Sequence, residues 1–232
     1  MKVRCSSIGK IMTSPKTKGE VLSKTTKTFI EDLFKENELG IYKDFSSKHT
    51  SKGNECEKEG IALANEVLGW GLDFDYIENG GQERYENDYI KGHTDVSTDS
   101  ILADIKVSYS GTSFPFFMEL EDIPKDYYYQ LQGYMWLTGK NVSTLAYCLI
   151  NTPEKQVLDE IRAEYWKQGV IDEDLEIEEF IRAKHNFDRF PKTQRVKAFL
   201  VERNDSVIEK IKERVLECRE YYNSLFKKFN VE

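Results

Sequence analysis

Residues 101–108 read Ile-Leu-Ala-Asp-Ile-Lys-Val-Ser, and this stretch decides the fold. Its odd-numbered positions are all apolar, whereas the even-numbered positions from 104 onward are polar. Successive side chains of a β-strand point to opposite faces of a sheet. The pattern therefore predicts a strand with one face in the core and with Asp104, Lys106 and Ser108 on the other face. Taken alone, this acid and this lysine are most simply a structural ion pair.

The segment before this strand places a second carboxylate next to the first. If residues 99 and 100 form a two-residue turn, the antiparallel register puts Asp95 directly opposite Asp104. The same register puts His93 opposite Lys106. Two carboxylates that face each other across a strand pair repel, which destabilises the pairing. A bound divalent cation would remove the repulsion, and oxygen ligands around a partly hydrated Mg²⁺ are typical of centres that cleave phosphodiesters.

A third carboxylate belongs to a helix expected over residues 51–68. Glu57 shares one face of this helix with Gly60, Ile61 and Ala64, so it lies on the small, apolar side that packs inward. A carboxylate on a buried face needs a partner because its unpaired burial is costly. A lysine or an arginine would satisfy it, and so would a metal shared with the two other carboxylates. The shared metal explains its position better.

A helix expected over residues 125–138 contributes an amide and a phenol. Gln130 and Tyr134 are four residues apart and therefore stack on one helical face. They could orient Lys106, a water molecule or a phosphate. Alternatively, they form a half-buried polar and aromatic stripe without a chemical role.

The order of the remaining segments predicts an α/β fold in one domain over residues 1–232. We expect helices at 6–12 and 19–37, strands at 72–77, 89–97, 144–151 and 195–202, an acidic helical region ending near 185, and a C-terminal helix from 206. Ser206 and Glu209 have the spacing of a capping box for that last helix. Helices and strands in this order favour a central mixed sheet of about five strands, flanked by helices on both faces.

The charge of the chain is distributed unevenly. Its net charge is −8, which argues against a protein that coats nucleic acid by bulk electrostatics. Residues 1–27, however, contain seven basic side chains and one acidic one, whereas residues 172–179 read DEDLEIEE. A basic N-terminal region on an acidic chain fits an enzyme that binds phosphates locally. Two solvated faces without a partner explain the charges equally well.

The cysteines and the hydropathy indicate the cellular compartment. The four cysteines are scattered without a C-x-x-C pair, so they predict free thiols and neither a disulfide framework nor a zinc site. No stretch is apolar enough for a membrane span, and the first residues lack the apolar core of a signal peptide. We therefore expect a soluble, cytoplasmic protein.

The motifs together resemble the PD-(D/E)XK nuclease superfamily, and within it phage lambda exonuclease and related viral recombination nucleases. No single motif is specific, but their order and spacing are. The resemblance covers residues 4–150 and rests on Arg4-Cys5-Ser6-Ser7-Ile8-Gly9, Gly53-Asn54-Glu55-Cys56-Glu57, Gly92-His93-Thr94-Asp95, Asp104-Ile105-Lys106 and Gln130-Leu131-Gln132-Gly133-Tyr134.

The resemblance implies a restriction-endonuclease-like core at about 50–150, followed by a C-terminal strand and helix at about 195–230. It implies that Asp95, Asp104, Glu57 and the Ile105 carbonyl bind Mg²⁺ or Mn²⁺. It also implies that Lys106 positions or deprotonates the attacking water, and that Gln130 and Tyr134 support the lysine and the phosphate. By the same resemblance, Arg4 and Ser6 bind the 5′-terminal phosphate of DNA.

The family also suggests a biological role and a set of partners. Its members degrade one strand of duplex DNA from 5′ to 3′, and some form toroidal trimers that work with a strand-annealing protein. The first hypothesis is therefore an exonuclease acting at DNA ends in phage-type recombination or repair. A structure- or sequence-specific endonuclease and a DNA-binding scaffold without activity are the alternatives, and the intact set of four motif residues argues against the scaffold.

Two positions depart from the family pattern. Thr94 stands where the superfamily has its proline, and Asp104 replaces a glutamate, so the metal would lie closer to the strand. A branch with an iron–sulfur cluster is disfavoured, because it needs three clustered late cysteines and only Cys148 and Cys218 occur late, far apart.

Overall fold

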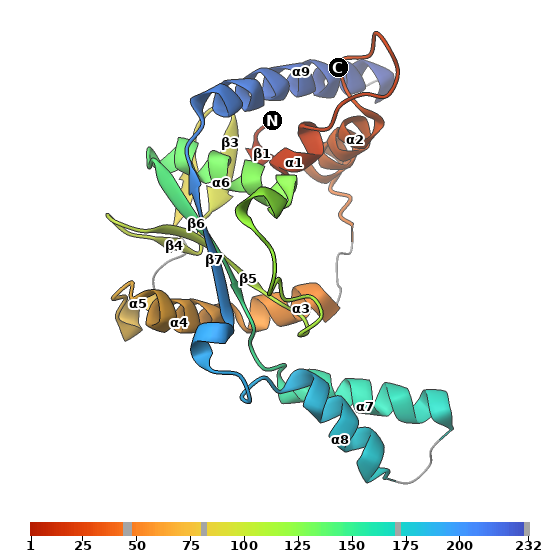
Figure 1. Ribbon diagram of the computed structural model, residues 1–232. Coiled ribbons are helices and arrows are strands. Elements are labelled where there is room, and N and C mark those ends of the chain that lie inside the picture. The colour runs from red at the N-terminus through yellow and green to blue at the C-terminus, as the bar shows by residue number, and fades with distance from the viewer. Residues whose placement is uncertain (44–47, 80–82, 170–172, 230–232) are drawn as a thin grey trace.

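The computed structural model describes residues 1–43, 48–79, 83–169 and 173–229. Its centre is a mixed four-stranded sheet in the order β4-β5-β6-β7 (Figure 1). The pair β4–β5 is antiparallel, β5–β6 is parallel and β6–β7 is antiparallel. The bounds are Val96–Ser97 for β4, Leu102–Val107 for β5, Val142–Cys148 for β6 and Val196–Glu202 for β7.

A second sheet of three strands, in the order β1-β3-β2, lies beside the first. Its strands are β1 (Val3–Arg4), β2 (Arg84–Glu86) and β3 (Ile90–His93). The expected α/β class with a mixed, helix-flanked sheet is confirmed. The expected single sheet of about five strands is divided, because the strand predicted at 89–97 leaves one sheet after His93 and enters the other at Val96.

Helices cover both faces of the four-stranded sheet. The main helices are α1 (Ile8–Ile11), α2 (Lys24–Leu39), α3 (Lys48–Glu55), α4 (Glu57–Leu68), α5 (Phe74–Asn79), α6 (Lys125–Thr138), α7 (Glu154–Gln168), α8 (Leu175–His185) and α9 (Asp205–Phe229), with short 3₁₀ turns at Cys5–Ser7, Leu120–Asp122 and Lys192–Gln194. Helix α4 packs on one face, against Ala103 and Ile105, and α6 packs on the other with α1 and α9 behind it.

The contact between α4 and β5 is close. A Cβ atom on Gly60 would lie 3.0 Å from Cγ2 of Ile105 and 3.1 Å from Cγ2 of Val107. A larger side chain at this position would push the helix away from the strand. The glycine thus lets the helix that carries Glu57 lie directly on the strand that carries Asp104 and Lys106.

The sequence-based expectations for residues 72–77 and for the start of the C-terminal helix are wrong. The strand expected at 72–77 is largely helix α5, because the Asp73 carboxylate accepts a hydrogen bond from the Tyr76 amide and starts a helix there (2.7 Å). The C-terminal helix does not use a Ser206–Glu209 capping box. Asn204 caps it instead, and its Oδ1 accepts from the Val207 amide at 3.2 Å.

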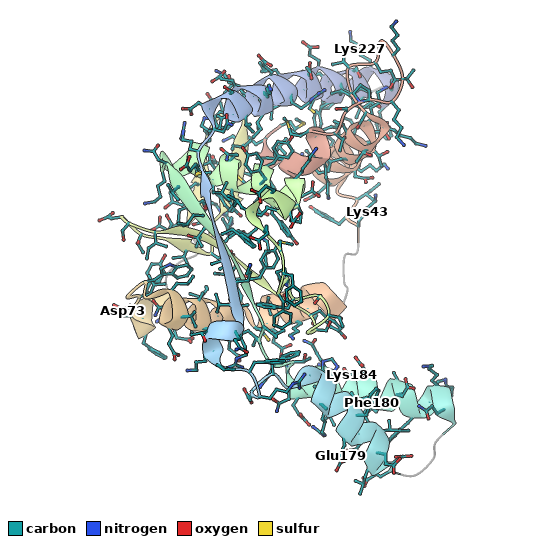
Figure 2. The ribbon with its side chains drawn as sticks, in the orientation of Figure 1. Lys43, Asp73, Glu179, Phe180, Lys184 and Lys227 are labelled. Atoms are coloured by element: carbon teal, nitrogen blue, oxygen red, sulfur yellow. The ribbon has the colours of Figure 1, made fainter. Side chains whose placement is uncertain are left out.

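Helices α7 and α8 form a hairpin that projects from the rest of the protein (Figure 1). The hairpin has a small core of its own, made by Val157, Ile161 and Ile181. The acidic run at 172–179 falls on this hairpin, with residue 172 outside the described residues. Part of the run has a structural role, because Asp174 caps α8 by accepting from two backbone amides. Figure 2 labels Glu179, Phe180 and Lys184 on the same helix, with Lys184 at the end nearer the rest of the protein.

All four cysteines are free and buried, as expected. Within the described ranges, no helix has both the length and the apolar character that a membrane crossing requires.

Candidate active site

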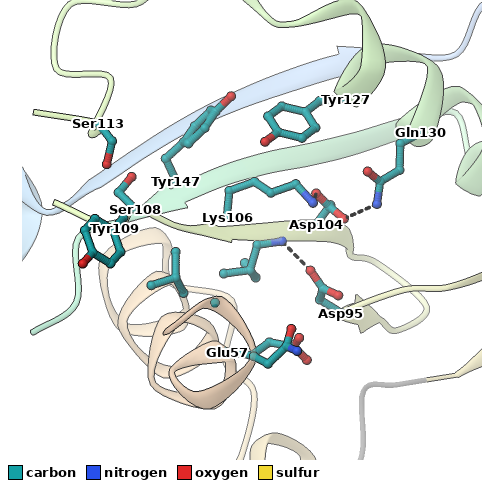
Figure 3. A pocket seen from close by; sticks show the side chains of 14 residues that line it. Glu57, Asp95, Asp104, Lys106, Ser108, Tyr109, Ser113, Tyr127, Gln130 and Tyr147 are labelled. Carbon is teal, nitrogen blue, oxygen red and sulfur yellow. Dashed lines mark hydrogen bonds and ion pairs between the residues drawn. The ribbon is translucent and has the colours of Figure 1, made fainter. Parts of the chain in front are cut away.

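A pocket opens beside β5, next to the first residue of β4, where none of the described residues continues the strand pairing along that edge (Figure 3). It brings together Glu57 from α4, Asp95 from the end of the β3–β4 segment, Asp104 and Lys106 from β5, and Gln130 from α6. The backbone of Ile105 lies on the same pocket wall. The sequence places these residues in separate segments, and the structure brings all of them to one pocket.

The hairpin register is confirmed for the two aspartates. Val96 pairs with Ala103, and the Thr98 amide donates to the Ile101 carbonyl at 2.9 Å. Continuing this ladder by one residue places Asp95 opposite Asp104. In place of a strand partner, the Ile105 amide donates to Oδ2 of Asp95 at 2.6 Å. The Asp95 side chain therefore completes the hydrogen bonding of the strand edge.

The second half of the register prediction is wrong. His93 does not lie opposite Lys106, because β3 belongs to the other sheet, where His93 pairs with Arg84. Lys106 pairs instead with Tyr147 in the parallel ladder between β5 and β6. The chain changes sheets at Thr94, a fully buried residue, and the antiparallel ladder to β5 starts only after that change.

Asp104 is held by two partners in the pocket. Its side chain is 2% exposed, and its Oδ1 accepts from Nε2 of Gln130 at 2.9 Å. Its Oδ2 lies 2.7 Å from the ammonium of Lys106. The ion pair that the sequence leaves open as an alternative is therefore present, inside a pocket that also holds Asp95.

Gln130 and Tyr134 stack as predicted. Nε2 of Gln130 also donates to the Tyr134 hydroxyl at 2.8 Å, one turn further along α6. A buried amide with two fixed partners has little freedom to rotate. Tyr134 therefore holds Gln130, and Gln130 holds the Asp104 carboxylate.

The charges in the pocket perturb one another. Burial raises the pKa of Asp95 well above its usual range, and the neighbouring charges of Asp104 and Glu57 raise it further. Burial lowers the pKa of Lys106, but the charge of Asp104, its hydrogen bond and the charge of Asp95 together outweigh burial, so the net pKa lies above the usual value for lysine. The site thus places an ammonium group beside an acid, Asp95, whose ionised form is disfavoured.

The donor chemistry fits a hard divalent cation. Carboxylate oxygens are the ligands that Mg²⁺ prefers, and a cation beside Asp95 would favour its ionised form. Glu57 approaches from the α4 side of β5, whereas Asp104 and Lys106 lie on the α6 side (Figure 3). Among the described residues, no three His, Cys, Asp or Glu side chains are already close enough together to hold an ion.

A second pocket lies beside the first. Tyr134, which holds Gln130 in the first pocket, also lines the second. Arg4 and Ser6, the residues expected to bind phosphate, line it, and so do Arg84, Lys91 and His93. Gly92 permits this arrangement. A Cβ there would lie 2.8 Å from both Sγ of Cys5 and Cε1 of Tyr134, so only glycine lets β3 pass this close to α6.

Comparisons with known proteins show what this chain is similar to. No model of a known protein family matches the chain, and neither does any curated protein sequence. The solved structure of a phage related exonuclease from Haemophilus somnus 129PT matches 99% of this chain and 96% of its own, with 29% identity and a TM-score of 0.78. The resemblance to the lambda exonuclease-like branch of the PD-(D/E)XK superfamily is thereby confirmed.

The same exonuclease fold recurs in a more distant protein. An alkaline exonuclease from Laribacter hongkongensis covers 99% of this chain and 91% of its own, with 14% identity and a TM-score of 0.64. Its complex with dAMP gives 16% identity and a TM-score of 0.62. At this level of identity, the likeness concerns the fold alone.

Sequence reasoning assigned no role to three tyrosines that line the pocket, Tyr109, Tyr127 and Tyr147. Tyr127 precedes Gln130 by three residues, so helical spacing alone could have placed it on the same face of α6. Tyr147 reaches the pocket through the parallel register of β5 and β6, which no local pattern reveals.

Proposed function

We propose that this protein is a divalent-metal-dependent deoxyribonuclease that removes nucleotides from the ends of duplex DNA. The observation that carries the proposal is the convergence of Asp95, Asp104 and Lys106 in one pocket. It is supported by the overall likeness to a phage related exonuclease, which extends over nearly the whole of both chains.

In this proposal, Asp95, Asp104, Glu57 and the Ile105 carbonyl hold the metal. When bound, Mg²⁺, or Mn²⁺ in its place, polarises the scissile phosphate and lowers the pKa of a water molecule. The ammonium of Lys106 offsets the charge that develops on the phosphate and positions the water.

Helix α6 supplies the support for these groups. Gln130 keeps the Asp104 carboxylate turned into the pocket, and Tyr134 fixes Gln130 in turn. Such fixed groups need no reorganisation at the moment of reaction, which is the main source of electrostatic catalysis.

The basic pocket beside the catalytic one supports an exonuclease over an endonuclease. Arg4 and Ser6 would bind the terminal 5′ phosphate there, next to the bond that is cut. Guanidinium and hydroxyl donors suit a phosphate monoester. This arrangement favours 5′-to-3′ degradation, and a role in phage-type recombination with a strand-annealing partner, in trimers, extends the proposal by family resemblance.

One digestion experiment tests the activity. The protein is incubated with linear and with closed circular duplex DNA, each with Mg²⁺ and with EDTA. An exonuclease shortens only the linear DNA and only with Mg²⁺. Opened circles would show an endonuclease instead, and intact DNA in every tube would show a scaffold without activity.

A further inference from the structure

The catalytic lysine needs a second support. The Lys106 side chain is long, 25% exposed, and reaches into the pocket from near the end of β5. Its ion-pair partner is Asp104, two residues earlier on the same strand, at 2.7 Å. In the proposed function Asp104 is also a metal ligand, so its charge is shared with a cation that repels the ammonium. A neutral group that attracts the ammonium would keep it in place throughout the reaction.

Tyr127 has the position and the chemistry for this task. The Lys106 ammonium lies 4.9 Å from the centroid of the Tyr127 ring. A cation over an aromatic face is attracted by the ring quadrupole, and the attraction does not depend on ionisation of the ring. Tyr127 is in the first turn of α6, three residues before Gln130, so one helix face holds both Asp104 and Lys106.

The ring itself is fixed. Tyr147 packs edge-on against Tyr127, with the ring centroids 6.2 Å apart and the planes at 64°. Tyr147 is 8% exposed, lies beside Lys106 in the sheet, and packs edge-on against Phe199 of β7. Figure 3 shows Lys106 extending past these two rings towards Asp104. The Tyr127 ring that faces the ammonium is therefore held in place by Tyr147, which belongs to the hydrophobic core.

We infer that Tyr127 is a positioning residue, which holds the ammonium of Lys106 in its working place through the face of its ring. The inference rests on the proposed function. Tyr127 acts through Lys106, and its ring face, rather than its hydroxyl, is the part that matters.

Kinetics with matched variants test the inference. Tyr127→Leu and Tyr127→Met remove the ring but keep apolar bulk, and each should lower kcat about tenfold while KM stays within about twofold. Tyr127→Phe and Tyr127→Trp keep an aromatic face and should stay within about twofold of the parent. Tyr128→Leu, the same change at the next residue, whose ring contacts Tyr129 and not Lys106, should leave kcat unchanged.

Two outcomes would overturn the role of the ring. If Tyr127→Phe is as slow as Tyr127→Leu, the hydroxyl is the active part. If Tyr127→Leu and Tyr127→Met both match the parent, the ring does nothing for the lysine. A parent that cuts no DNA contradicts the proposed function itself, so the two failures are distinguishable.

A stability measurement tests the same contact without any cleavage. Thermal unfolding in EDTA is compared for Tyr127→Leu, Lys106→Met and the double variant. A favourable contact means that the double variant loses less in Tm than the two single losses added together. Tyr128→Leu combined with Lys106→Met should be additive. Additivity at Tyr127 as well would show that the ring and the ammonium do not interact.

Discussion

The two pockets on either side of Tyr134 differ in how far their charged side chains are exposed to water. In the proposed catalytic pocket, Asp104 is almost fully buried and is bound by Gln130 and Lys106. In the basic pocket, the Arg4 side chain is 63% exposed and makes one ion pair, with Glu36 at 3.2 Å. Both pockets depend on α6, yet only one of them removes its charged groups from water.

This difference predicts where function and stability are coupled. A buried charge interacts strongly with its neighbours because little water screens it, whereas an exposed ion pair contributes almost nothing to folding. Substitutions in the catalytic pocket should therefore change both the chemistry and the melting temperature. Substitutions in the basic pocket should change the recognition of DNA ends and leave the fold as it is.

Lys106→Ala should have the largest effect on activity. Removing the ammonium takes away the charge that faces the phosphate, and losses of about 10² to 10³ in rate are typical for such a group. DNA binding should stay within a few-fold, because other cations contact the duplex. Single-turnover cleavage of a linear duplex with Mg²⁺ measures the rate, and a filter-binding assay in Ca²⁺ measures affinity.

Lys91→Ala is the matched control for this change. Lys91 is an exposed lysine of the basic pocket, so its removal should leave the cleavage rate at saturating DNA within about threefold. If Lys106→Ala cleaves as fast as Lys91→Ala, the lysine of β5 has no part in the chemistry.

Asp95→Asn should stabilise the metal-free protein. The pKa of Asp95 is raised in the fold, so the native state binds its proton more tightly than the unfolded chain does. Stability is therefore lost as pH rises above 3.8, the ordinary pKa of an aspartate, towards the raised pKa, and the loss persists at neutral pH. Asparagine avoids this loss, and its carbonyl oxygen can still accept from the Ile105 amide.

Melting curves in EDTA between pH 3.5 and 8 measure this effect. At neutral pH the Tm of Asp95→Asn should exceed that of the parent by about 2–4 °C for each kcal/mol of stability gained. This difference should vanish at the acid end of the range. Mg²⁺ should raise the Tm of the parent and not that of the variant, because a ligand stabilises the state that binds it. An equal response to Mg²⁺ in both proteins would remove Asp95 from the metal site.

The sequence was informative wherever a local pattern specified the contact. Alternation along β5 fixed which side chains share a face, and a two-residue turn fixed that Asp95 lies opposite Asp104. Helical spacing likewise placed Gln130 next to Tyr134. In each case the partners are close in sequence or joined by a short turn, so geometry leaves few alternatives.

The remaining features depend on contacts between distant segments. His93 falls in the second sheet because β1, at the start of the chain, pairs with β3. Tyr147 enters the pocket through a parallel pairing whose connection includes the whole of α6. The helix at 74–79 depends on Asp73 as its cap, in a segment whose alternating pattern resembles a strand. No periodicity in the sequence encodes these choices.

Arg4→Ala should have the smallest effect of the three changes, and it tests the basic pocket directly. If Arg4 binds the terminal phosphate, the parent should degrade 5′-phosphorylated duplex faster than unphosphorylated duplex, and the variant should lose about tenfold or less of that preference. Lys2→Ala is the control, because Lys2 is also near the N-terminus and also pairs with a glutamate, Glu86, at 2.9 Å. The Tm should not change in either variant, since both ion pairs are exposed. A parent that ignores the 5′ phosphate, or a Lys2→Ala variant that loses as much preference as Arg4→Ala, would mean that the basic pocket attracts DNA only through its overall charge.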